Sequence, residues 1–378
     1  MAAEAHAGSL SLDLRAALVI GLAAALSDAA CQGIGLSGES IAYGALIAAL
    51  VVRPDFSRWP LLIYPVLIVL VGICLAIGVS LGLGLSNVPQ VFVFGLVAAL
   101  MQLITLLLPS KLRLLSGVVA CAGVLPLLGT PSWEGWRDEM LAIVIGLLAG
   151  TLLQLTFTPA GLKQPPEESR TEAEDPPLAD RIRAGLSSPF FWRKLVFASL
   201  AYAIGLGVGA VTPKYLYFGV VLLLNDSIGA TMARVRDRMV GVSLGVLMPL
   251  LVFNTIGLSE LSIGLVMGGT AALLAALNRR SYLRTALISS GVAFIGYGPL
   301  VAWYIPHRWI DYLMGSALAL AVGVFLFPNS ALRRFNQLTA GEHNPTVASE
   351  LQVLLPAATE EARWLGLPKP QLPAWFNT

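Results

Sequence analysis

The sequence predicts an all-α membrane protein with about twelve transmembrane helices. These helices are expected to form two parallel six-helix repeats around a pseudo-twofold axis along the membrane normal. The first reason is composition: of 378 residues, 56% are hydrophobic and 12% are charged, whereas soluble domains carry about 25% charged residues. The second reason is a polar segment that separates two sets of apolar runs with a shared pattern. The composition excludes a cytosolic globular enzyme, a disordered chain and a secreted disulfide scaffold.

The apolar runs set the number of spans. A hydrocarbon core of about 30 Å requires roughly 20 helical residues. The first run is longer than the apolar core of a signal peptide, so we expect an uncleaved first span. The predicted spans fall near residues 14–36, 39–53, 58–85, 89–108, 112–129, 136–158, 188–210, 214–227, 234–254, 259–277, 281–300 and 309–327.

The basic residues predict the orientation. With the N-terminus inside, all but three of the 24 lysines and arginines lie on the cytoplasmic side, which is the bias expected of membrane proteins. We therefore expect an integral protein of the inner or plasma membrane with both termini in the cytoplasm. The exceptions are Arg137, Lys214 and Arg308. They indicate either a positive outer vestibule that attracts anions or ion pairs with nearby acids such as Asp138 and Asp311.

The linker defines the domain organisation. It is acidic, rich in proline and without hydrophobic periodicity, which is typical of a segment that forms no core of its own. Six spans on each side insert both halves in the same orientation, so we expect a pathway on the axis between them. The predicted parts are the first repeat, the cytoplasmic linker, the second repeat and a cytoplasmic tail, at residues 1–161, 162–187, 188–328 and 329–378.

Each half has an unusually short second span and ends with a Trp-x-Asp motif before a span that closes with proline. The short spans cover residues 39–52 and 215–226. Short hydrophobic segments at matching positions point to a transport site. Exposed backbone is costly in lipid, so such spans are either broken or tilted helices that line a cavity, or helices that borrow residues from their neighbours.

A glycine-rich segment in the second half carries a family resemblance. Gly229-Ala230-Thr231 leads into Arg234, and Gly241 and Gly245 follow on the same predicted helix. This run resembles the third-helix signature of the fusaric acid resistance protein-like family. The closing Leu326-Phe327-Pro328 is similar to the end of its six-helix module. The first half resembles the family only at residues 53–58 and Gly72, and it lacks Gly-Ala-Thr.

The resemblance implies a function. The family includes exporters of aromatic carboxylic acids and is related to the aluminium-activated malate transporters of plants, which are anion channels. It implies two six-helix modules around one pathway and a small organic anion as substrate. Larger bacterial members carry cytosolic domains that this chain does not match. The alternatives are an anion channel of the malate-transporter type and a non-transporting membrane scaffold or accessory subunit.

Arginines near the signature are the candidate substrate ligands. An anionic substrate requires fixed positive charge, and the forked guanidinium suits a carboxylate. Arginines at cytoplasmic helix ends are also expected from topology alone. The predicted substrate-binding residues are Arg234, Arg238, Arg58, Arg53, Asn225 and Asp226.

Asp28 lies in the middle of the first predicted span. Ionisable residues within spans are costly and mark functional sites by default. We predict that Asp28 exchanges a proton during transport, or else that it forms an ion pair with an arginine or bonds a backbone donor in the bundle.

The remaining residues exclude other chemistry. Three cysteines and three histidines are scattered, which predicts no metal site and no cofactor. No nucleophile has a recognisable base, so an intramembrane enzyme is not expected. No block of like charge suggests nucleic acid. The expected partners are the lipid bilayer and a small organic anion, and the sequence leaves open a periplasmic accessory protein or a homo-oligomer.

Overall fold

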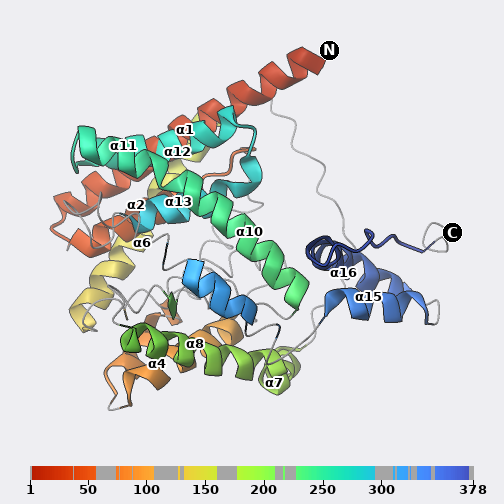
Figure 1. Cartoon of the computed structure of the whole chain (residues 1–378). Coiled ribbons are helices and arrows are strands. Elements are labelled where there is room, and N and C mark those ends of the chain that lie inside the picture. The colour runs from red at the N-terminus through yellow and green to blue at the C-terminus, as the bar shows by residue number, and fades with distance from the viewer. Residues whose placement is uncertain are drawn as a thin grey trace. The chain divides into compact units, whose positions relative to one another are not determined.

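The computed structural model is helical throughout the residues it describes and contains no strand among them (Figure 1). The described residues are 2–36, 38–56, 74–75, 77–86, 88–105, 127, 132–159, 177–208, 216–217, 227–293, 310, 313–321, 324, 330–341 and 345–373. The helices are α1 (Ala2–Gly33), α2 (Gly38–Val51), α4 (Gln90–Thr105), α6 (Trp133–Phe157), α7 (Leu178–Ser187), α8 (Pro189–Gly207), α10 (Ile228–Gly245), α11 (Leu247–Thr255), α12 (Glu260–Ala276), η3 (Arg280–Tyr282), α13 (Leu283–Val292), α15 (Ala331–Thr339) and α16 (Pro345–Trp364).

Four of the described helices are long and apolar enough to cross a membrane. They are Leu10–Gly33, Trp133–Phe157, Phe190–Gly207 and Ile228–Thr255, and each coincides with a predicted span. Together with the composition, they identify an integral membrane protein. Much of the predicted spans near 58–85, 112–129, 214–227 and 309–327 lies outside the described residues. The arrangement as two six-helix repeats therefore stays a prediction.

The short second span of the first half is confirmed. Helix α2 has 14 residues, which gives about 21 Å at 1.5 Å per residue and is too short for a core of about 30 Å. Its counterpart near 214–227 lies outside the described residues apart from Leu216, Tyr217 and Ser227.

The chain forms two compact units, and each contains residues from both sides of the linker. Unit 1 comprises Met1–Ser188 and Val240–Trp309, and unit 2 comprises Pro189–Met239 and Ile310–Thr378. The predicted domain boundaries concern sequence repeats, and this division does not test them.

Helices α1 and α12 of unit 1 pack through small residues. A Cβ on Gly21 would lie 2.7 Å from the carbonyl oxygen of Gly264, and a Cβ on Gly268 would lie 2.9 Å from that of Ala17. Gly264 and Gly268 are four residues apart and so share one helix face, and small residues at this spacing let backbones approach closely. Higher numbers on α1 meet lower numbers on α12, so the two helices are antiparallel.

The same device joins two further helix pairs in unit 1. A Cβ on Gly150 of α6 would lie 2.5 Å from the carbonyl oxygen of Ala48 in α2. A Cβ on Gly146 would overlap the carbonyl of Gly44, one turn earlier in α2. Because higher numbers meet higher numbers, α2 and α6 are parallel.

The signature glycines of α10 serve the third pair. A Cβ on Gly241 would lie 2.5 Å from Cγ2 of Thr285 in α13, and a Cβ on Gly245 would overlap the carbonyl of Ala286. The order of these contacts makes this end of α10 parallel to α13. Gly241 and Gly245 therefore have a packing role.

A break separates α10 from α11 at Val246. Pro249 has no N–H to donate to the carbonyl of Gly245 four residues earlier. Ser290 Oγ of α13 donates to that carbonyl instead, at 2.7 Å, and Thr270 Oγ1 of α12 lies 3.0 Å from Ser290 Oγ. The buried hydroxyl pair thus satisfies a backbone group that would be costly to leave unbonded in an apolar interior.

The tail in unit 2 forms a helical hairpin. Phe335 of α15 is buried against Leu351 and Ala358 of α16. Ser330 caps α15, because its side chain accepts a hydrogen bond from the N–H of Arg333. The short polar tail predicted from the sequence therefore has an apolar cluster of its own.

Candidate functional site

The first part of the site is the signature helix α10, which contacts the tail. Gly229 lies against the backbone of α16: a Cβ at this position would overlap the carbonyl of Ala357 and lie 3.1 Å from Cβ of Glu361. Only glycine permits this approach without a shift of one helix. The glycine of Gly-Ala-Thr thus admits the tail helix, which the sequence analysis did not foresee.

An ion pair reinforces this contact. Arg236 Nη1 donates to Glu360 Oε2 at 2.5 Å, and the Glu360 side chain is only 8% exposed. Trp364 Nε1 donates to Glu360 Oε1 at 3.3 Å. The neighbouring Glu361 accepts from the backbone N–H of Leu332 at 3.2 Å. Arg236 is therefore engaged by the tail.

Arg238 is placed differently on the same helix. Its Nη1 atom is buried and has no hydrogen-bond partner among the described residues. Arg234 is exposed. A buried guanidinium N–H without an acceptor is costly, and a carboxylate is the acceptor that suits it best.

Arg53 begins the turn that follows α2 in unit 1. Its backbone N–H donates to Oε1 of the buried Gln154 in α6, at 2.9 Å. The N–H of Phe56 donates to the carbonyl of Arg53 at 3.0 Å, and the buried Phe56 ring anchors the turn despite a φ of 48°. The start of the residue 53–58 segment is therefore fixed against α6.

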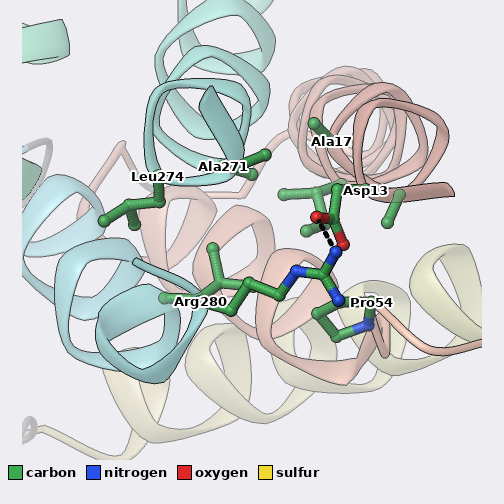
Figure 2. A pocket seen from close by; sticks show the side chains of 10 residues that line it. Asp13, Ala17, Pro54, Ala271, Leu274 and Arg280 are labelled. Atoms are coloured by element: carbon green, nitrogen blue, oxygen red, sulfur yellow. Dashed lines mark ion pairs between the residues drawn. The ribbon is translucent and has the colours of Figure 1, made fainter. Parts of the chain in front are cut away.

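An acid and a basic residue from distant parts of the sequence meet in a hollow of unit 1 (Figure 2). Asp13 of α1 is 7% exposed, and its Oδ2 lies 2.5 Å from Nη2 of Arg280 in η3. Pro54 lies beside the guanidinium, and the other lining side chains are apolar. The hollow has about 260 Å³ of empty space, which includes its open mouth.

Comparison with protein families gives a match in the second half of the chain. Residues 197–322, about a third of the chain, match the fusaric acid resistance protein-like family. This segment is therefore similar to that family. The match confirms the suspected resemblance and includes α10, α12 and Arg280. Comparison with curated proteins and with solved structures gives no match.

The family points to membrane transport or resistance, and its members are transporters rather than enzymes. In the described residues, no group of three or more His, Cys, Asp and Glu side chains could hold a metal ion. Among the arginines of the matched segment, the structure separates Arg236, which is engaged, from Arg238, which has a buried nitrogen without a partner among the described residues.

Asp28 lies at the end of the α1–α12 contact where α12 begins. It is 1% exposed, and its Oδ2 accepts a hydrogen bond from Gln32 Nε2 at 2.7 Å. Glu260 at the start of α12 is close enough to repel it. Among the described residues Asp28 forms no ion pair, so the interpretation as half of a salt bridge gains no support. Its proton-coupling role stays a prediction.

Arg137 is the one member of the predicted outer vestibule within the described residues. It is 67% exposed and lies 3.0 Å from Asp138, as the alternative interpretation expected. Trp133 and Trp136 meet edge to face at 6.0 Å in the same first turn of α6, which is typical of a helix end at the membrane interface. Lys214 and Arg308 lie outside the described residues.

The structure thus covers half of the six predicted substrate ligands. Arg53, Arg234 and Arg238 are described, whereas Arg58, Asn225 and Asp226 lie outside the described residues. Neither Asp13 nor Arg280 was predicted from the sequence as a site residue. A usable signal was present: Asp13, Ala17, Gly21, Ala25 and Asp28 follow one another at helical spacing, which indicates a face of small residues with an acid at each end.

Proposed function

We propose that the chain exports small organic anions, aromatic carboxylates in particular, through a pathway between the two predicted repeats. The observation that carries this proposal is the environment of Arg238. This residue lies in the segment that matches a transporter family, and its guanidinium has a buried nitrogen without a protein acceptor in the described part of the chain. A substrate carboxylate would supply the missing acceptor.

The directions of packed helices support the predicted order in which the chain reverses, whichever side of the membrane the termini occupy. The chain reverses its direction at every span. Two spans with both numbers odd or both even must therefore be parallel, and an odd and an even span must be antiparallel. Helices α1 and α12 correspond to spans 1 and 10 and are antiparallel. Helices α2 and α6, from spans 2 and 6, are parallel, and so are α10 and α13, from spans 9 and 11. All three pairs have the expected direction.

Cysteine labelling tests this topology. In a variant whose three native cysteines are replaced by serine, Val353→Cys places a thiol on α16 at a side chain that is 78% exposed. Glu168→Cys places another in the linker. We expect an impermeant maleimide to label both only after the inner face is opened. Labelling of either position in sealed cells would contradict the twelve-span arrangement.

Flux in proteoliposomes tests the transport function. The purified full chain is reconstituted, and uptake of labelled benzoate, malate and chloride is measured with and without an imposed pH gradient. We expect uptake of benzoate above that of protein-free liposomes. Uptake of chloride and malate that does not depend on the pH gradient would favour an anion channel instead. A preparation that retains its folded, cooperative thermal transition but moves none of the three anions would overturn the proposal.

A further inference from the structure

We propose that Arg280 is an anion-binding residue at the inner end of unit 1, and that Asp13 is a tethered competitor that occupies the place of the substrate carboxylate. The inference rests on the proposed transport of organic anions and adds a site that lies outside the predicted ligands. It is carried by the hollow of Figure 2, in which the Asp13 carboxylate faces the Arg280 guanidinium.

The guanidinium has donors to spare. Its Nη2 pairs with Asp13, and in the described part of the chain no other partner holds its remaining N–H groups. Arginine presents five donors in a planar fork that can bind a second acceptor. The side chain is 45% exposed, so an anion can reach it, whereas the Asp13 side chain is 7% exposed and belongs to the wall.

The walls suit the body of an aromatic acid. Ala17 and Ile20 of α1 line the hollow together with Ala271 and Leu274 of α12. Sites for small organic molecules combine an apolar lining with a few placed polar groups. A benzoate-like anion would set its ring against these aliphatic side chains and its carboxylate at Arg280.

The surrounding charge favours an anion. Arg53 adjoins the lining residue Pro54, Arg279 precedes Arg280, and Arg284 follows one turn later, close enough to Arg53 for the two charges to repel. The acids in these same segments are Asp13 and Asp55. An excess of positive charge therefore remains around the pair, and such an excess attracts anions from solution.

The hollow is small. Apart from its open mouth it has room for about one water molecule. An aromatic acid must therefore part Asp13 from Arg280 to enter. Because one carboxylate replaces another, the guanidinium keeps an anionic partner throughout.

Opposite effects of two single substitutions test this inference. Binding of benzoate to the purified full chain is measured from the rise in thermal unfolding temperature, and uptake is measured in proteoliposomes. Arg280→Gln should weaken benzoate binding by about ten- to a hundredfold, because it removes a charged hydrogen-bond donor. Asp13→Asn should strengthen binding by about three- to tenfold, because it removes the competitor. Arg183→Gln, at an exposed arginine of α7, is the control and should change neither quantity.

A charge swap separates an anion site from a structural lock. Asp13→Arg combined with Arg280→Asp recreates the ion pair with its ends exchanged. It should restore thermal stability but leave benzoate binding weak. Full recovery of benzoate binding in the swapped chain would overturn the inference, and so would Asp13→Asn that weakens binding as much as Arg280→Gln.

Two further outcomes keep the test decisive. If Arg280→Gln does not fold, Arg280→Lys keeps the charge and loses the fork, and we expect it to bind benzoate more weakly than the native chain. Unchanged binding in the lysine variant would overturn the inference. If the native protein transports benzoate and the Arg280 and Asp13 variants bind and transport it equally well, this site alone is disproved. Native protein that moves no anion disproves the proposed function itself.

Discussion

Two arginines, one in each compact unit, form the same short ion pair in different surroundings. Arg236 meets Glu360 in unit 2, and Arg280 meets Asp13 in unit 1, both at 2.5 Å and with similar exposure of the arginine side chain. Glu360 also accepts from Trp364 and lies on a helix whose backbone touches Gly229. Asp13 has no second partner among the described residues and borders a hollow.

The difference teaches that pair distance and exposure do not decide whether an arginine is available to a ligand. The number of groups that hold its partner carboxylate decides it. Glu360 is fixed by several donors on a docked helix, so its release requires the tail to move. Asp13 is held by one donor, so an incoming carboxylate has only one interaction to replace.

The largest expected effect comes from a substitution that moves the tail away from α10 and so breaks the Arg236–Glu360 pair. In Gly229→Ala the new methyl group would overlap the Ala357 carbonyl, which is backbone and cannot turn aside. Overpacking typically costs about 1–3 kcal/mol, and we expect the upper end of this range here. The tail should undock, which limited proteolysis of residues 345–373 would detect.

Gly207→Ala is the matched control for this prediction. Gly207 is also a helical glycine of unit 2, but a Cβ there would meet nothing within 4 Å. This variant should keep the protease resistance of the tail. Equal protease resistance in Gly229→Ala and Gly207→Ala would show that the tail contact tolerates a methyl group. It would contradict the view that close docking of the tail keeps Arg236 paired with Glu360.

A smaller effect is expected from two arginines of α10 that lie two residues apart. Arg238→Gln should weaken anion uptake by about ten- to a hundredfold, because a charged hydrogen bond is worth about 1.5–3 kcal/mol. Its expression and thermal stability should stay near native. Arg236→Gln should leave the affinity for anions unchanged and instead increase proteolysis of the tail, because its partner is Glu360.

Uptake kinetics and proteolysis of both variants decide between these roles. If the two substitutions weaken uptake equally, the ion pair with the tail does not remove Arg236 from the site. If neither changes uptake, both arginines serve topology alone, which is the alternative that the sequence analysis kept open.

Much of the local structure could be predicted from the sequence, because span length and residue spacing are local properties. The apolar runs near α1, α6 and α8 and the short α2 are visible as patterns. The partners of these helices are not. Gly264 and Gly268 are a visible pair in the sequence, but nothing in it indicates that they face Gly21 of α1.

The site was harder to predict for the same reason. Asp13 and Arg280 are far apart in sequence, and positive-inside topology already accounted for the arginine. Gly229 was recognised as part of a family signature, whereas its contact with α16 depends on a tail that looked polar. Arg238 was predicted as a ligand together with Arg234, and only the buried Nη1 atom distinguishes it.

The smallest effect on stability is expected at Asp28, which extends the comparison to the two buried acids of α1. Asp13 has a cation, whereas Asp28 has Gln32 as its hydrogen-bond donor and Glu260 as a nearby like charge. Asp28→Asn keeps the shape of the side chain and an oxygen that can accept from Gln32. It also removes the repulsion from Glu260. We therefore expect thermal stability to stay within about 1 kcal/mol of native.

The functional effect of Asp28→Asn should be selective. A carboxylate that is 1% exposed is costly to keep ionised without a cation. A group that takes up and releases a proton can couple anion movement to a pH gradient. Asparagine cannot do this. The variant should exchange benzoate at equal pH but lose accumulation driven by a pH gradient, whereas Asp13→Asn should keep that accumulation. Poor expression, with the free energy of unfolding lowered by about 3–5 kcal/mol, would indicate a broken ion pair instead. Full gradient-driven transport by Asp28→Asn would show that the acid has no part in coupling.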